Sequence, residues 1–477
     1  MILAPSFSRK ALLYLGAVLV PLIAVIVAKE WWEALFIPVG LLTVWLTMYR
    51  LDWAMWLIVF ATPVSVTLND LTGGSGLSLP TEPLLVLVTA ITLVKFFFFA
   101  EYDKRLITHP ISIAIYVYLA WMLLTVVTSE LPLVSIKQWI TRVWFIVPYY
   151  FVLGHLFLKS ERNRTVFLWL FLIPLIVACL YTMVIHSQYG FTKKTSTWVM
   201  FPLFKEHTSY GAVLAMFYPA ALYLTFRKSS WGFNAIAGVL LLLLTAATVL
   251  SYTRAAWLSL VGAGAVYLVY AFKMSRATVW SLIGVVLLIA ALNFDTISSK
   301  FERNRTDSSD NFNEHVASVT NVSTDASNLE RINRWMCAIR MYQDRPILGH
   351  GPGTYMFLYA PYQKPYEKTI ISTNAGNRGN AHSEYLSPLA ESGTLGLLTF
   401  LGILLTVVTT SIRAYQRLTD PRSKGLLRTA FLGLITYYLH GFLNNFLDMD
   451  KASAPFWGFT ALIAVLSLSQ NETTKEN

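Results

Sequence analysis

Long runs of apolar residues recur along almost the entire chain, separated by short polar segments. About 20 mostly apolar residues cross the roughly 30 Å hydrocarbon core of a bilayer, so each run predicts a transmembrane helix. The predicted spans are 11–28, 32–49, 52–68, 82–100, 109–127, 141–158, 166–185, 207–226, 231–251, 255–272, 277–293, 383–411, 429–445 and 453–469. Only Arg50 and Leu51 separate the second run from the third, so we expect 12–14 spans.

One hydrophilic segment of 88 residues, 294–381, interrupts this pattern. In its second half, Ser327-Asn-Leu-Glu330 has the pattern of a capping box and predicts the start of a helix. Four large side chains are predicted to share one face of this helix: Ile332, Trp335, Ile339 and Tyr342. Pro346 and the glycine-rich turn 349–353 predict its end. We expect an amphipathic helix lying on the membrane surface over the mouth of the bundle.

Composition supports an all-α integral membrane protein. The chain has 477 residues, of which 55% are apolar and 13% are charged. Soluble domains carry about 25% charged and about 45–50% apolar residues. A single soluble enzyme, a disordered chain and a repeat solenoid are therefore excluded. We expect three parts: about eleven spans in 1–293, a loop domain at 294–381, and about three spans in 382–477.

The net charge of +11 reflects orientation in a membrane rather than binding to nucleic acid. If both termini are cytoplasmic and the spans alternate, 18 basic residues fall in cytoplasmic segments and eight in short outer segments. Positive residues concentrate on the cytoplasmic side, so this topology is favoured and segment 294–381 is expected outside. Arg9 and Lys10 then precede an uncleaved first helix. The two cysteines, Cys179 and Cys337, form neither a disulfide framework nor a metal-ligand pattern.

Charged residues at span ends are functional candidates, because charge is costly near the hydrocarbon. Those predicted at the outer face are Arg142, Lys205, Glu206, His207, Arg254 and His382. Arginine matches the oxygens of a phosphate, and its fixed charge can stabilise a pyrophosphate leaving group. Histidine titrates near neutral pH and can take a proton from an attacking hydroxyl. The combination therefore indicates an anion site beside a base.

Structural roles are the alternative for each of these residues. Arg142, between Trp139 and Trp144, has the surroundings of a lipid-headgroup anchor. Arg254 could simply pair with a carboxylate. His207 and His350 could each be structural residues that form hydrogen bonds within the fold.

Five motifs in 240–410 resemble the superfamily of O-antigen ligases, O-antigen polymerases and protein O-oligosaccharyltransferases. They are Thr253-Arg254 followed by Trp257, Arg331-x-x-x-Trp335-x-x-Ala338, Pro346-Ile-Leu-Gly349-His-Gly351-Pro-Gly353, Asn380-x-His382-Ser-x-Tyr385-Leu and Glu391-x-Gly393-x-x-Gly396-Leu-Leu. Their order, an arginine turn, a long loop and then Asn-x-His at the next helix, is typical of the superfamily.

The resemblance implies a GT-C-like, metal-independent, inverting glycosyltransferase without a cofactor, facing the periplasm from the bacterial inner membrane. It would take a glycan from undecaprenyl pyrophosphate and transfer it to a lipid A–core hydroxyl as a ligase, our first choice. Other acceptors would be a growing glycan for a polymerase or a protein hydroxyl for an oligosaccharyltransferase. By matching motif, His382 would be the base and Arg254 would bind pyrophosphate. Arg331 matches the arginine of the loop helix, while Arg142 and Lys205 match as substrate-binding residues by position only.

Two hypotheses from other classes remain open. A transporter of lipid-linked glycans predicts ionisable residues near the middle of the membrane and broken helices in corresponding halves. The sequence shows neither feature. A non-catalytic scaffold predicts that His382 and Arg254 can be replaced freely.

Overall fold

The computed structural model describes residues 36–67, 78–99, 102–272, 326–364 and 379–468, with a few positions before residue 36. These residues are almost entirely helical, which confirms an all-α protein. Two short strands, β1 (Val66–Thr67) and β2 (Ser78–Leu79), pair antiparallel, with Val66 opposite Leu79. The predicted spans 11–28 and 277–293, and the first part of the hydrophilic segment, lie outside the described residues.

Within the described residues, nine helical segments are long and apolar enough to cross a membrane. They are α5 (Thr81–Phe99), α7 (Pro110–Val127), the continuous segment Pro132–Lys159, α10 (Glu161–Gln188), α12 (His207–Phe226), α13 (Trp231–Leu250), α14 (Arg254–Ala271), α20 (Leu386–Arg417) and α22 (Asp450–Leu468). Each contains or closely matches a predicted span, because the apolar runs that cross hydrocarbon also form uninterrupted helices.

The segment Pro132–Lys159 begins nine residues before its predicted span. It consists of α8 (Pro132–Ile146), a π-helical turn η3 (Val147–Val152) and α9 (Leu153–Lys159). Pro148, which cannot donate a backbone hydrogen bond, lies in the π turn. Arg142 therefore lies well inside a helix rather than at its first residue.

The structure does not form two separate spans on either side of Arg50, as the sequence had predicted for 32–49 and 52–68. The described helices, α2 (Phe36–Tyr49) and α3 (Leu51–Ala61), have 14 and 11 residues. With the 3-10 turn η2 (Thr62–Val64) they form one pair bent by 119°. Helix α3 with η2 is shorter than the about 20 residues that a full crossing needs, and α2 is described only from Phe36 on. This correction leaves one broken or re-entrant pair in this part of the chain.

Helix α21 (Pro421–His440) lies earlier than the predicted span 429–445. The Asp420 carboxylate accepts hydrogen bonds from the backbone N–H groups of Arg422 and Ser423. This cap starts the helix before the apolar run begins, within a polar stretch. The segment 441–449 that follows contains no long helix and leads into α22.

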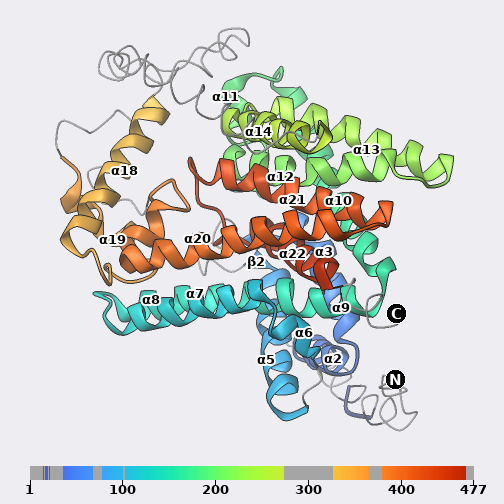
Figure 1. Ribbon diagram of the computed structural model, residues 1–477, viewed down its shortest axis with the longest axis horizontal. Coiled ribbons are helices and arrows are strands. Elements are labelled where there is room, and N and C mark those ends of the chain that lie inside the picture. The colour runs from blue at the N-terminus through green and yellow to red at the C-terminus, as the bar shows by residue number, and fades with distance from the viewer. Residues whose placement is uncertain are drawn as a thin grey trace.

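Helices α7, α10, α12, α20, α21 and α22 lie alongside one another in the bundle (Figure 1). At its centre, every residue of α22 from Asp450 to Leu466 is buried. Helix α22 packs on α20, α21 and η3, and α12 packs on α13, α14 and α21. Three shorter elements complete the bundle: α6 (Lys104–Ile107), α11 (Lys193–Ser196) and η4 (Ala360–Tyr362).

The helix predicted after Ser327 is α18 (Ala326–Asp344), which lies with α19 (Tyr355–Leu358) beside the start of α20 (Figure 1). The four side chains predicted to share one face, Ile332, Trp335, Ile339 and Tyr342, are each partly buried. The covered residues include Cys337, Ala338 and Met341, which pack with Tyr355 and Tyr359. Small side chains allow this closer approach.

A break in α20 ties the turn 345–353 to the bundle. Gly393 has φ +71°, a conformation that L side chains rarely adopt, so the helix is interrupted there. The interruption leaves three consecutive carbonyls available for other donors. Those of Ala390 and Glu391 accept from the backbone of His350 and Gly351, and that of Ser392 accepts from Trp121 Nε1.

Candidate functional site

The backbone of His382 is held in an uncommon conformation just before α20. Its φ is +48°, a value rare for residues other than glycine and more frequent at functional sites. Asn380 Oδ1 accepts a hydrogen bond from His382 N at 3.0 Å, and Trp335 Nε1 donates to His382 O at 3.2 Å. The motif residues Asn380 and Trp335 thus fix the direction of the histidine.

The imidazole of His382 lies among cations. Burial, together with the nearby positive charges of Arg331 and Arg334, lowers the pKa of His382 to about 4. Glu330 and a hydrogen bond with Asn444 act in the opposite direction. The histidine is therefore neutral at physiological pH and carries a free lone pair for a proton.

Two fully buried polar residues, Asn444 and His440, extend the site behind His382. Each is 1% exposed, and Asn444 Nδ2 lies 3.1 Å from His440 Nε2. The sequence reasoning missed both residues. Their spacing of four inside the predicted span 429–445 was the available signal, because polar side chains are costly there.

Two further cations lie on a second side of the site: Lys205, just before α12, and Arg254, the first residue of α14. Burial raises the pKa of Glu206, while the charges of Lys205 and Arg331 oppose that effect, so both cations lie close to this carboxylate. Thr253 Oγ1 donates to His207 O at 2.8 Å, which places neighbouring Arg254 beside the start of α12. The structure therefore brings Lys205, Arg331 and His382 to one region and Arg254 next to it.

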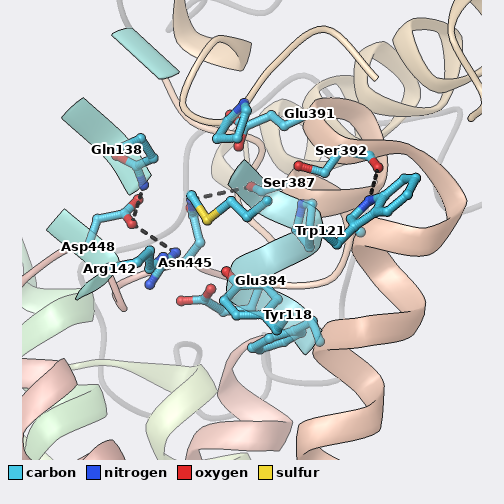
Figure 2. Close-up of a pocket in the computed structure, with 15 residues that line it drawn as sticks. Tyr118, Trp121, Gln138, Arg142, Glu384, Ser387, Glu391, Ser392, Asn445 and Asp448 are labelled. Carbon is cyan, nitrogen blue, oxygen red and sulfur yellow. Dashed lines mark hydrogen bonds and ion pairs between the residues drawn. The ribbon is translucent and has the colours of Figure 1, made fainter. Parts of the chain in front are cut away.

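Arg142 lines a small polar pocket (Figure 2). Its guanidinium pairs with Asp448 at 2.8 Å, and Gln138 Nε2 donates to the same carboxylate at 2.6 Å. Arg142 Nε and Asn445 Oδ1 are buried and have no hydrogen-bond partner in the described parts of the chain. The cavity has a volume of about 50 Å³ and is also lined by Trp121, Tyr118, Glu384 and Glu391.

Glu384 connects the pocket to the His382 segment. Its Oε1 accepts from Tyr437 OH at 2.5 Å and from the backbone of Phe446 and Leu447 at 2.7 and 2.9 Å. Its backbone N donates to Gly441 O at 2.8 Å. Burial raises the pKa of Glu384, and the charge of Arg142 opposes this. These bonds hold segment 441–447, and with it Asn444, against His382.

Within the described parts of the chain, no three or more His, Cys, Asp or Glu side chains form a group that could hold a metal ion. The groups available to bind an anion are the guanidinium and ammonium groups beside His382.

Residues 238–401 match a family model described as O-antigen ligase. The match contains Arg254, Arg331 and His382, and it ends inside α20. It confirms the family resemblance that the motifs indicated. No curated protein sequence matches the chain.

Proposed function

Starting from the O-antigen ligase domain at residues 238–401 of this membrane-spanning protein, we propose an inverting glycosyltransferase of the inner membrane. It would move a glycan from undecaprenyl pyrophosphate to a lipid A–core hydroxyl at the periplasmic face. The observation that carries this proposal is a neutral, oriented His382 next to the Arg331 guanidinium. A base beside a fixed cation suits hydroxyl attack with loss of an anionic leaving group.

His382 accepts the proton of the acceptor hydroxyl in this proposal. The oxygen then forms a bond to the anomeric carbon of the glycan, on the side opposite the pyrophosphate. The bond from that carbon to the pyrophosphate oxygen breaks, and its electron pair leaves with polyprenyl pyrophosphate. Attack from the opposite side inverts the anomeric configuration. The leaving group is already activated, so the proposed step uses no nucleotide and no metal.

The leaving pyrophosphate is assigned to Arg331, Lys205 and Arg254. Charge-assisted hydrogen bonds from arginine to phosphate oxygens are strong and directional. Cations placed before the reaction stabilise charge as it develops, without reorganisation. Lys205 and Arg331 both lie near Glu206, and their charges oppose the rise in its pKa that burial causes.

The Arg142 pocket is better suited to a neutral group with several hydroxyls than to pyrophosphate. Asp448 already pairs with Arg142, and Glu384 and Glu391 also line the pocket, so a second anion is disfavoured. The unpaired Arg142 Nε can donate to a hydroxyl and the unpaired Asn445 Oδ1 can accept from one. We therefore assign the pocket to sugar hydroxyls of the acceptor, a role different from the one expected for Arg142 from its sequence position.

An O-antigen or exopolysaccharide polymerase and a protein O-oligosaccharyltransferase would use the same base and cations with another acceptor. A transporter of lipid-linked glycans is the alternative from a different class. The convergence of a neutral base and several cations at one place in the bundle favours transfer chemistry over transport.

A deletion strain carrying wild type or His382→Ala tests the proposal. Lipopolysaccharide ladders and undecaprenyl-linked glycan are measured together, and His155→Ala, on α9, is the matched histidine control. Loss of the base is expected to reduce transfer about 10²–10⁴-fold. If the protein is a ligase, the deletion strain and the His382→Ala strain lose the lipopolysaccharide ladder and accumulate long lipid-linked glycan. Wild type restores the ladder.

Accumulation of single lipid-linked repeat units would instead identify a polymerase. Unchanged lipopolysaccharide in the deletion strain would exclude the lipid A–core acceptor. Full activity of His382→Ala would overturn the base assignment.

A further inference from the structure

Asn444 lies between two histidines that are far apart in the sequence. Its amide nitrogen is 3.1 Å from His440 Nε2, and its side chain also forms a hydrogen bond with His382. Asn444 and His440 are each 1% exposed, so water does not compete for these bonds. The segment that carries Asn444 is fixed by the bonds from Phe446 and Leu447 to Glu384.

The hydrogen-bonding capacity of an amide determines where the protons lie. The Asn444 nitrogen can only donate, so His440 Nε2 must accept and the His440 proton is on Nδ1. His440 Nδ1 has no hydrogen-bond partner among the described residues, so His440 makes its single side-chain bond to Asn444. With its nitrogen directed to His440, Asn444 presents its oxygen to His382. An amide oxygen can only accept, so the His382 nitrogen that faces it carries a proton.

We propose that Asn444, oriented by His440, is a positioning residue that fixes the tautomer of His382. This inference rests on the proposed function, in which His382 is the general base. One ring nitrogen donates its proton to Asn444 Oδ1, which leaves the lone pair of the other nitrogen for the acceptor hydroxyl. A third group that orients the base is a recurring arrangement in nucleophilic catalysis. After proton transfer, the same oxygen also stabilises the imidazolium.

Asn444 is the uncharged member of this arrangement for a physical reason. Arg331, Arg334 and Glu330 of α18 already face His382, and the two arginines lower its pKa. A carboxylate at position 444 would raise the pKa of His382 and keep the base protonated at higher pH. An amide orients the ring with a smaller effect on its charge.

The test is histidine-selective ¹⁵N NMR of the full-length protein in detergent, which reports the tautomer and protonation of each ring. The His382 signal is assigned by its loss in His382→Ala. Wild type is expected to show one His382 tautomer, and Asn444→Leu a mixture of both. Asn444→Asp is expected to keep one tautomer and to raise the pH at which His382 protonates. Asn234→Leu removes a partly buried amide bond on α13 and is the matched control.

Transfer kinetics with an undecaprenyl-pyrophosphate glycan and purified lipid A–core give the second readout. Asn444→Leu is expected to lower kcat about 10- to 100-fold, less than the 10²–10⁴-fold typical of losing a base, while KM for the lipid-linked donor stays unchanged. Asn444→Asp is expected to recover part of kcat, with its acid limb at higher pH.

An unchanged His382 tautomer in Asn444→Leu would overturn the inference, even if transfer were lost. Unchanged His155 and His186 signals show that the fold is retained in the variant. If wild type transfers no glycan, the proposed function fails, while the NMR result still decides whether Asn444 fixes the tautomer.

Discussion

At the scale of single residues, neighbouring charges separate the roles of two arginines. Arg331 faces His382, His440 and the buried carboxyl of Glu206. Arg142 is paired with Asp448 in a pocket lined by further carboxylates. Both side chains carry the same permanent charge. The charge of Arg331 acts on the His382 base, whereas that of Arg142 acts on the carboxylates of its pocket.

Arg331→Gln is expected to move the acid limb of glycan transfer to higher pH. His382 works in its deprotonated form, so the rate falls as pH decreases through its pKa, which is about 4 in the native protein. Removing the Arg331 charge raises that pKa. The measurement is transfer rate against pH with detergent-solubilised enzyme. The pH midpoint of the acid limb is compared between wild type and Arg331→Gln. The maximal rate is not compared, because losing a proposed substrate-binding residue also lowers it.

Arg340→Gln is the control on the same helix. Its guanidinium donates to Tyr362 O at 2.7 Å, and Arg340 is not among the charges that shift His382. An acid limb that stays in place in Arg331→Gln would contradict the electrostatic explanation.

At the scale of elements, the break in α20 connects the motif Glu391-x-Gly393 to the turn 345–353. Thr394 N donates to Pro346 O at 2.9 Å, and Gly351 N donates to Glu391 O at 2.8 Å. Gly393 therefore enables two segments of the family match to contact each other. In an uninterrupted helix, the carbonyl of Glu391 would instead accept a hydrogen bond from a backbone N–H of α20 itself.

Gly393→Ala is expected to destabilise the protein, whereas Gly402→Ala in the same helix should not. An added Cβ at position 393 would contact Ile347 O and Pro346 O, and a side chain at this φ and ψ, which essentially only glycine adopts, costs about 1–3 kcal/mol. At Gly402 nothing lies within 4 Å of the new Cβ, and alanine favours a helix by about 1 kcal/mol over glycine. Thermal unfolding in detergent measures both. Equal midpoints for the two variants would argue against a required kink.

At the scale of the whole molecule, a buried polar cluster joins the early helices to the central helix α22. Asp450 Oδ2 accepts from Ser65 Oγ at 2.7 Å and Thr81 Oγ1 at 2.6 Å. Lys451 Nζ donates to Ser65 O at 2.7 Å. Asp450 and Lys451 are 2% and 4% exposed, so the cluster holds η2, α5 and α22 together without solvent.

Lys451→Met is expected to lower stability by about 3–5 kcal/mol, the usual cost of removing one partner from a buried ionic group. The methionine removes the positive charge that interacts with the Asp450 carboxylate, and it removes the Lys451 donor to Ser65 O. Unfolding midpoints in detergent measure the loss, with exposed Lys159→Met as control. A midpoint equal to that of the control would show that the cluster does not stabilise the fold.

The predicted orientation of the bundle is tested with single cysteines. Ile347, which is 69% exposed, is expected outside, and Lys228 is expected in the cytoplasm. A membrane-impermeant maleimide applied to intact spheroplasts should label Ile347→Cys and should label Lys228→Cys only after lysis. Wild type is the control, because its described cysteines, Cys179 and Cys337, are buried. The reverse pattern would invert the topology.

The sequence by itself determined the class of the fold and most of the described spans. It also identified the motif residues His382, Arg254 and Arg331, whose roles stay predictions. Hydropathy and helix periodicity are local properties, and hydrocarbon demands a helix wherever an apolar run is long enough. The same local pattern failed at the bend beside Arg50, because apolar character does not specify whether two short helices cross separately.

Only the tertiary structure decided which remote groups meet. It placed Asn444 and His440 against His382, enclosed Arg142 with Asp448, and packed the Cys337 side of α18 against Tyr355 and Tyr359. These contacts join residues dozens of positions apart, and no pattern within one helix encodes its partner. Packing selects the faces that fit closely, and the resulting burial and neighbouring charges determine the chemistry of each side chain.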